Sequence, residues 1–137
     1  MFFTSREIRF GDVDVAGIIF YPRYFAMLND VVDDWLESLG FGFRRLMQDF
    51  GCSTPVVHIE TSFRVPLRFG DSVKFEVTAK EIGSRSATLD IITFKEDKKV
   101  ILTALTIVCV QNGAITSLAW PASVKSALKS FAEATEH

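Results

Sequence analysis

Residues 10–25 read Phe10-Gly11-Asp12-Val13-Asp14-Val15-Ala16-Gly17-Ile18-Ile19-Phe20-Tyr21-Pro22-Arg23-Tyr24-Phe25. Two carboxylates, Asp12 and Asp14, lie one residue apart between two glycines, which is typical of a tight loop. Pro22 favours the start of a helix, because proline lacks the N–H that this position leaves unbonded and already has a helical φ. A loop of this kind places a carboxylate beside free backbone donors, and such an arrangement can bind and polarise a carbonyl group.

A long amphipathic helix is predicted to follow this loop. Apolar residues recur at steps of three and four, at Tyr24, Met27, Leu28, Val31, Val32, Trp35, Leu36 and Leu39. Gly40 stands where a glycine C-cap belongs. The helix should therefore contain about eighteen residues and extend roughly 27 Å at the α-helical rise. Its apolar arc is wide, so we expect other structure to wrap most of it.

The remainder of the chain is predicted to be mainly strand. The expected strands, which alternate apolar and polar residues or are rich in β-prone residues, are 3–10, 57–65, 73–80, 87–95 and 100–110. Strand 57–65 is expected to be half-buried, and strand 100–110 to be central and covered on both faces. Shorter helices are predicted at 43–50 and 121–132. Since short connections favour antiparallel neighbours, the sequence predicts an α+β fold with one long helix against an antiparallel sheet.

Composition narrows the class of protein. A chain of 137 residues with 48% hydrophobic residues is predicted to form a single domain, residues 1–137, with a sizeable core. The net charge of −2 and the scattered basic residues give no electrostatic basis for binding nucleic acid or an anionic membrane. Cys52 and Cys109 lack metal-ligand spacing. Charged residues interrupt the first twenty positions, and no apolar run reaches membrane-spanning length, so we expect a soluble cytoplasmic protein.

The loop motif and the order of the predicted elements resemble the hot-dog-fold thioesterases of the 4-hydroxybenzoyl-CoA thioesterase family. The family motif, Gly-Asp-x-Asp-x-x-Gly-x-x-(aromatic)-Tyr-Pro/His, is matched by Gly11, Asp12, Asp14, Gly17, Phe20, Tyr21 and Pro22. The resemblance covers nearly the whole chain. It implies a curved antiparallel sheet wrapped around the long helix and self-association as a homodimer or homotetramer, with active sites between subunits. It also implies hydrolysis of an acyl-CoA thioester, with no metal and no cofactor beyond the CoA of the substrate.

Three residues carry over to catalytic positions through this resemblance. Asp14 is the expected catalytic carboxylate, which either attacks the thioester carbonyl or activates a water. The backbone N–H of Tyr21 is expected to bond the carbonyl oxygen, and Gly17 is expected to let the backbone approach the substrate closely. A thiolate is a good leaving group, so a weak oxygen nucleophile suffices when the carbonyl is polarised.

The resemblance also assigns substrate-binding positions. Thr54 matches a position that lines the pantetheine and acyl region, and Arg85 with Ser86 matches the end of a basic segment that meets the nucleotide phosphates. That segment has Gly83 and Ser84 where some relatives have arginines, so the alternatives are fewer phosphate contacts or contacts from Lys80, Arg64 or Arg68. Asn29 stands where hydroxybenzoyl-specific enzymes have an aspartate, which favours a different aryl group or a medium-chain acyl group. The apolar part of the pocket is assigned to Phe20, Phe25 and Met27.

Several of these residues also have a plainer interpretation. Aspartates in turns commonly bond their own backbone, and we assign that role to Asp12. His58, which lies six residues from Cys52, is expected to be structural or to line a pocket. The acidic residues of the long helix are expected to be solvated or to face an interface. Some hot-dog thioesterases place their acid on this helix, so a catalytic role for these residues stays open as an alternative. These residues are Asp30, Asp33, Asp34 and Glu37.

Two other functions are compatible with a hot-dog fold. A protein that binds acyl-CoA or acyl-carrier protein without hydrolysis would share the fold and the pocket. A dehydratase or hydratase usually needs a His near the loop, and none occurs in residues 1–57, so this function is disfavoured.

Overall fold

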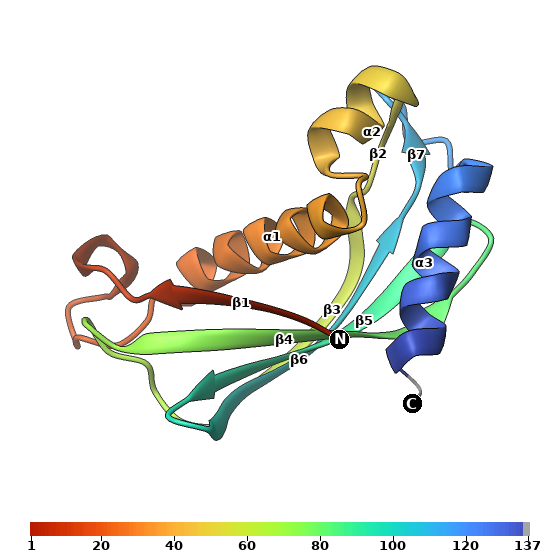
Figure 1. The fold of residues 1–137 in the computed structure, drawn as a ribbon. Helices are drawn as coiled ribbons and strands as arrows, with labels where there is room; N and C mark the ends of the chain where they lie inside the picture. Colours follow the sequence, from red (N-terminus) through yellow and green to blue (C-terminus); the bar gives the residue numbers. More distant parts are fainter. Residues whose placement is uncertain (136–137) are drawn as a thin grey trace.

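The computed structural model describes residues 1–135, and Figure 1 shows a long helix lying against a curved sheet. The elements in chain order are β1 (Phe2–Glu7), the 3-10 turn η1 (Phe10–Asp12), α1 (Tyr21–Ser38), α2 (Phe43–Asp49), β2 (Cys52–Ser53), β3 (Val56–Phe63), β4 (Ser72–Ile82), β5 (Ser86–Lys95), β6 (Lys98–Val108), β7 (Val110–Gln111) and α3 (Ala122–Thr135). Within residues 1–135, none of the helices combines the length and the hydropathy that crossing a membrane requires.

Five strands form the main sheet in the order β1-β4-β5-β6-β3, and each neighbouring pair is antiparallel. The predicted α+β class is therefore confirmed. The sequence predicts that strands joined by short connections pair with each other. The pairs β4–β5 and β5–β6 do so, but the prediction is wrong for β3, which pairs with β6 at the edge of the sheet. The 64–71 connection carries the chain past β6 and β5 to β4. The alternation of apolar and polar side chains predicts that a segment is a strand, but it does not predict which strand it pairs with. The sequence analysis therefore missed the pairing of β3 with β6.

The boundaries of α1 agree with the predicted caps. The helix has Pro22 in its first turn and is followed by Gly40, whose φ is +90°. Its buried face consists of Tyr24, Met27, Leu28, Val31, Val32, Trp35 and Leu36. In the core, the hydroxyl groups of Tyr24 and Thr93 lie 2.6 Å apart, which ties α1 to β5. Burial raises the pKa of Tyr24 to about 12.

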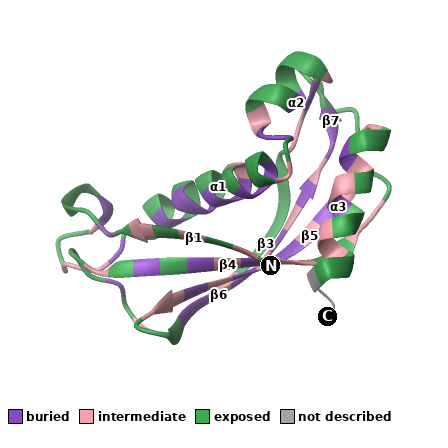
Figure 2. Cartoon of the chain, in the orientation of Figure 1, coloured by how far each residue is buried: buried purple, intermediate pink, exposed green. Residues whose placement is uncertain are grey.

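Burial on the sheet differs from the prediction in two strands. Along β5 and β6, every second residue is buried and those between are mostly half-exposed, so β6 is covered on one face and not on both. In β3, Val57 is 58% exposed and Phe63 is 44% exposed, and Figure 2 shows this strand as exposed along its length. The half-buried prediction for this strand is wrong, because β3 is an edge strand whose residues stay largely exposed even where Phe63 meets the rings of Tyr24 and Phe25 on α1.

Smaller elements surround the C-terminal end of α1 (Figure 1). A short ladder of β2 with β7, which the sequence did not predict, pairs Ser53 with Val110. The N-terminus of α2 is held on α1, because the Phe43 N–H donates to Asp33 Oδ1 at 2.8 Å. On the other side, α3 packs against β4, and the rings of Trp35 and Phe131 lie 5.4 Å apart. The two predicted shorter helices are thus confirmed.

Candidate active site

The loop that carries Asp14 is a small hairpin. Val13 and Ile19 form an antiparallel bridge, and the Asp14 N–H donates to the Ile18 carbonyl at 2.9 Å. The carboxylate of Asp14 takes part in this turn, since its Oδ1 accepts the N–H of Ala16 at 2.9 Å and that of Ile18 at 3.4 Å. The other oxygen, Oδ2, accepts no hydrogen bond from residues 1–135. Asp14 therefore has a fixed, exposed carboxylate with one oxygen available.

Gly17 is required by the backbone of this turn. Its φ is +79°, a conformation that L side chains rarely adopt, and a Cβ at this position would meet no atom within 4 Å. The positive φ alone explains why this residue is a glycine, because no other atom of residues 1–135 lies close enough to exclude a side chain. The space above it is open, so the expected approach to a substrate remains a prediction.

The loop rests on the connection between β3 and β4. The Ile19 N–H donates to the Leu67 carbonyl at 2.8 Å, and Ile18 forms a bridge with Arg68. The Phe20 N–H donates to the carbonyl of Asp12 at 2.8 Å. These bonds place the Asp14 hairpin directly before the N-terminus of α1.

The first turn of α1 presents one free backbone donor. Pro22 has no N–H, and the N–H of Phe20 is already bonded, whereas the N–H of Tyr21 has no acceptor within residues 1–135. A free N–H at a helix N-terminus lies in the positive end of the helix dipole. The Tyr21 N–H can therefore bind a carbonyl oxygen or an oxyanion.

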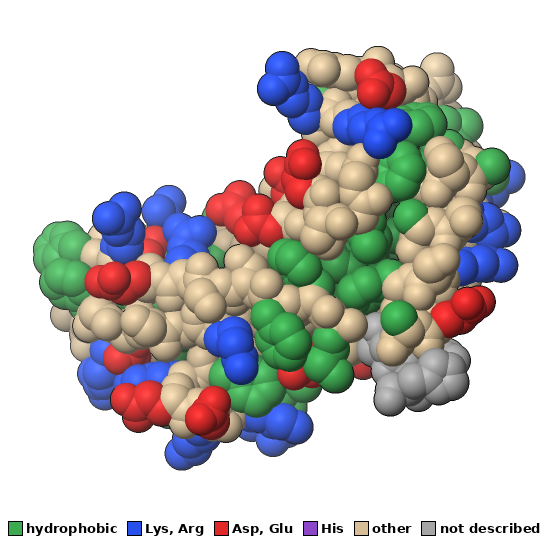
Figure 3. Space-filling model, in the orientation of Figure 1, with side chains coloured by type: hydrophobic (Ala, Val, Ile, Leu, Met, Phe, Trp, Pro, Cys, Tyr) green, Lys and Arg blue, Asp and Glu red, His purple; other side chains and the backbone are tan. Residues whose placement is uncertain are grey.

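An open hollow of about 490 Å³ adjoins Asp14 and is lined otherwise by apolar side chains, namely Phe10, Val13, Val15 and Phe20. Figure 3 shows hydrophobic side chains gathered at the end of the molecule where the η1 turn lies. Val15 is fully exposed and Phe10 is 75% exposed. The structure thus places the predicted catalytic acid and the predicted pocket residue Phe20 together.

A second cavity, of about 250 Å³, brings together two other predicted substrate residues, Asn29 and Thr54. The remaining lining residues are Phe43, Leu46, Met47, Ser53 and Pro55. Those of α2 were missed by the sequence analysis, because the apolar spacing of a seven-residue helix does not show what it packs against. Asn29 lies eight residues beyond Tyr21 on α1, about 12 Å along the helix. Within one chain, this cavity is therefore separate from the hollow at Asp14.

Aromatic side chains connect the first hollow with the edge strand β3. The ring of Phe20 lies 5.9 Å from Tyr21, that of Tyr21 lies 6.1 Å from Phe25, and that of Phe25 lies 6.5 Å from Phe63. All four rings are partly exposed, at 37% to 61%. Phe25 therefore belongs to an apolar surface that runs from the Asp14 loop to β3. Met27, in contrast, is 1% exposed and is part of the core.

Arg85 and Ser86 lie at neither of these places. Arg85 Nη1 donates to the carbonyl and to the hydroxyl of Ser117, at 3.0 and 3.1 Å, and the side chain remains exposed. The Ser86 carbonyl accepts the indole N–H of Trp120 at 3.0 Å. The backbones of Arg85 and Pro55 flank the end of β6 on opposite sides, since the Arg85 carbonyl accepts the Cys109 N–H and the Pro55 carbonyl accepts the Val108 N–H.

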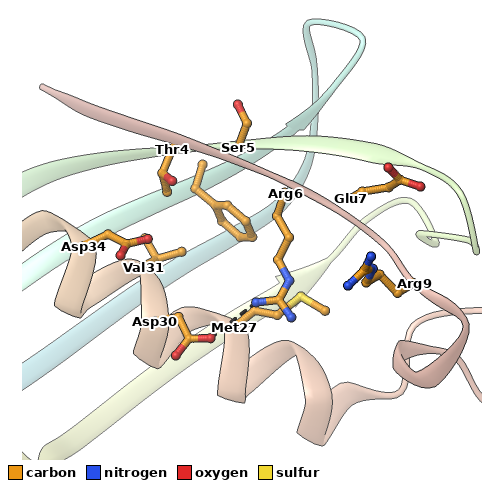
Figure 4. Close-up of a pocket in the computed structure, with 10 residues that line it drawn as sticks. Thr4, Ser5, Arg6, Glu7, Arg9, Met27, Asp30, Val31 and Asp34 are labelled. Carbon is orange, nitrogen blue, oxygen red and sulfur yellow. Dashed lines mark hydrogen bonds and ion pairs between the residues drawn. The ribbon is translucent and has the colours of Figure 1, made fainter.

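The acidic residues of α1 line neither hollow. Asp33 caps α2, and Asp30 forms an ion pair with Arg6 at 3.3 Å across an open groove between α1 and β1 (Figure 4). Burial raises the pKa of Asp34, which lines the same groove, and the charges of Asp33 and Asp30 raise it further. These contacts are structural and do not place a catalytic acid here.

His58 and Cys52 do not form a catalytic pair. His58 Nε2 lies 3.2 Å from Glu60 Oε1 on the exposed strand β3. Cys52 is buried beside Cys109, and burial raises the pKa of the Cys52 thiol. A thiol that stays protonated is a poor nucleophile. Within residues 1–135, no group of three or more His, Cys, Asp and Glu side chains could hold a metal ion.

A curved antiparallel sheet on one long helix, with an acidic loop at the helix N-terminus, is the hot-dog architecture. The family model described as the thioesterase-like superfamily matches residues 8–128, so the chain belongs to that superfamily. The family expected from the motif is therefore confirmed.

Three relatives illustrate the likeness. The 1,4-dihydroxy-2-naphthoyl-CoA hydrolase of Synechococcus elongatus is 28% identical over 110 residues, which cover 79% of this chain and 80% of the relative. The structure of a gentisyl-coenzyme A thioesterase is similar with a TM-score of 0.84 at 27% identity, covering 92% of this chain and 98% of that chain. A Staphylococcus aureus protein solved in complex with CoA has a TM-score of 0.88 at 15% identity, covering 96% and 84%, a likeness that shows the fold alone.

Proposed function

We propose that this chain hydrolyses the thioester of an aryl-CoA, with Asp14 as nucleophile or general base. The chain is an acyl-CoA thioesterase, given its superfamily and the relatives named above. The aryl assignment draws support from two relatives whose names specify aromatic acyl groups, dihydroxynaphthoyl and gentisyl. It is also supported by the size of the Asn29–Thr54 cavity, about 250 Å³, and by its mixture of apolar walls and polar groups.

One observation carries this proposal: Asp14 Oδ2 is free and lies one short hairpin away from the free Tyr21 N–H. In the reaction, the Tyr21 N–H donates to the thioester carbonyl oxygen and stabilises the oxyanion. Asp14 either removes a proton from the attacking water, or attacks the carbonyl carbon and forms a mixed anhydride that a water then hydrolyses. The C–S bond breaks, the CoA thiolate leaves and takes up a proton, and the product is the free acid.

We propose that the acyl group binds in the Asn29–Thr54 cavity of a second copy of the chain. Within one chain, Asp14 and Asn29 face different hollows. The exposed apolar residues of β3, which include Val57, Ile59 and Phe63, give a second copy a surface to cover. A two-fold dimer, or a dimer of dimers, would bring the loop of one subunit to the cavity of the other. In such a dimer, the exposed Arg85 would meet the CoA phosphates.

Thiol release from a panel of CoA esters tests this function. The panel contains benzoyl, hydroxybenzoyl, phenylacetyl, dihydroxynaphthoyl and aliphatic esters of several lengths. The proposal expects the highest kcat/KM for one of the aryl esters. A higher kcat/KM for an aliphatic ester than for any aryl ester would show that the substrate is a medium-chain acyl-CoA. If the folded protein binds these esters and releases no thiol, the non-hydrolytic binding function replaces the thioesterase.

A further inference from the structure

The tetrapeptide Arg-Phe-Gly-Asp occurs twice, at Arg9–Asp12 and at Arg68–Asp71, and the fold places the two copies against each other. The rings of Phe10 and Phe69 meet edge to face with their centroids 5.8 Å apart. Both copies are tight turns at the end of the molecule that carries the Asp14 loop. The first copy leads into that loop, and the second precedes β4.

The aspartates of the two turns make the same bonds to the backbone. Asp12 Oδ2 accepts the Arg9 N–H at 2.9 Å, and Asp71 Oδ2 accepts the Arg68 N–H at 2.7 Å. In return, each aspartate N–H donates to the carbonyl of its arginine, at 3.0 and 3.1 Å. As turn-forming residues, Asp12 and Asp71 are therefore equivalent.

The second carboxylate oxygen of each aspartate distinguishes the two turns. Asp12 is 2% exposed, and its Oδ1 accepts a hydrogen bond from Arg23 Nη2 in the first turn of α1 at 3.3 Å. Asp71 Oδ1 instead pairs with Lys95 Nζ at the β5–β6 hairpin, at 2.9 Å. Only Asp12 connects the loop to the helix whose N-terminus carries the free Tyr21 N–H.

We propose that Asp12 is a positioning residue, whose ion pair with Arg23 fixes the Asp14 carboxylate relative to the Tyr21 N–H. This proposal rests on the proposed roles of Asp14 and Tyr21. The link is short in sequence, because Asp14 follows Asp12 by two residues and Arg23 follows Tyr21 by two. Because Asp12 is 2% exposed, separating its carboxylate from Arg23 would leave a buried charge without its cation, which is costly. A displacement of about 1 Å between reacting groups can lower a rate by about a hundredfold.

The test compares Asp12→Asn with its twin, Asp71→Asn, in steady-state kinetics with the preferred CoA ester. We expect Asp12→Asn to lower kcat by about ten- to a hundredfold with KM within about twofold. We expect Asp71→Asn to lower the thermal midpoint and leave kcat within about twofold of wild type. Equal loss of kcat in both variants, at equal folded fraction, would overturn the proposal, because turn stability alone would then explain the effect.

Variants of Arg23 test the same ion pair from its other side. The Arg23 side chain is 53% exposed, so its substitution should disturb folding less than substitution of the buried Asp12. Arg23→Gln should match Asp12→Asn, Arg23→Lys should recover part of kcat, and the double variant Asp12→Asn/Arg23→Gln should be no slower than either single variant. Multiplied losses in the double variant would contradict a shared ion pair.

Hydrogen exchange separates this proposal from the proposed function. Asp12→Asn should speed exchange of the Phe20 and Gly17 amides, whereas Asp71→Asn should leave their exchange unchanged. If wild type turns over no thioester, the proposed function fails, and the exchange rates still decide whether Asp12 positions the loop. Unchanged exchange at both amides in Asp12→Asn would overturn the positioning role.

Discussion

The Asp14 loop and the Asn29–Thr54 cavity are built by different kinds of interaction. The loop is a surface structure held by backbone hydrogen bonds and by the ion pair of the buried Asp12 with the half-exposed Arg23, while the Asp14 carboxylate is exposed. The cavity lies between α1, α2 and the segment that enters β3, and mainly apolar side chains form its walls. Consecutive residues therefore specify the loop, whereas the cavity exists only once distant segments have packed. The difference separates the groups that perform the chemistry from those that select the acyl group.

Substitution of Asp14 by Asn should have the largest effect. The amide oxygen can still accept the Ala16 N–H, so the hairpin should persist, but the side chain can neither attack nor take a proton. We expect kcat to fall by about 10²- to 10⁴-fold. Thiol release under saturating CoA ester measures this loss, and circular dichroism checks the fold.

Asp97→Asn is the matched control for Asp14→Asn, because Asp97 lies in the β5–β6 turn with φ +63°, a conformation that asparagine also accepts. Its kcat should equal that of wild type. If Asp14→Asn has the kcat of wild type, Asp14 is not catalytic, and its role is limited to stabilising the turn.

The contrast between the two regions explains what the sequence could predict. The motif around Asp14 and the period of α1 are local, so they located the loop, the helix start and the caps correctly. The order of the sheet was missed at β3, because an edge and an interior strand share the same alternation. The α2 wall of the cavity was also missed. The spacing of Phe43 and Met47 in the sequence predicts a helix, but it does not predict that these residues line a cavity with Asn29.

Mixed oligomers test whether the two regions meet between subunits. Asp14→Asn removes the acid and Asn29→Trp fills the cavity, so each variant alone should be nearly inactive. Coexpressed in equal amounts, the chains form mixed dimers as half of all dimers, and each mixed dimer has one intact site of two. Activity should therefore recover to about one quarter of wild type. No recovery in isolated mixed dimers would place the whole site within one chain.

Asn29→Asp tests the selectivity of the cavity. A carboxylate accepts a hydrogen bond from a ring hydroxyl more strongly than an amide does. We expect the ratio of kcat/KM for 4-hydroxybenzoyl-CoA over benzoyl-CoA to rise about tenfold. Asn29→Leu, which has a similar shape and no polar group, should lower the same ratio. Unchanged ratios in both variants would show that the ring hydroxyl binds elsewhere.

Alkaline pH should weaken the protein through the buried thiol of Cys109. Burial, and then Cys52, raise its pKa to about 12 from the model-compound value of 9.0. Because the folded pKa is the higher one, the stabilisation is complete below pH 9 and is lost as the pH rises toward 12. Between pH 9 and 10, this group alone should lower the folding constant about fivefold. Urea unfolding should show a smaller loss for Cys109→Ala over this interval; an identical loss would assign the effect to other groups.

Arg85→Ala should have the smallest effect and reports on the far end of the substrate. An exposed contact between a guanidinium and a phosphate contributes little because water screens it, and Ser117 already engages one guanidinium nitrogen. We expect KM for the CoA ester to rise about threefold with kcat unchanged. The same acyl group on pantetheine, which lacks the nucleotide, should show no change in KM. An equal rise for both esters would mean that Arg85 acts by supporting the Ser117 loop beside the cavity, and the phosphates would then belong to another basic residue.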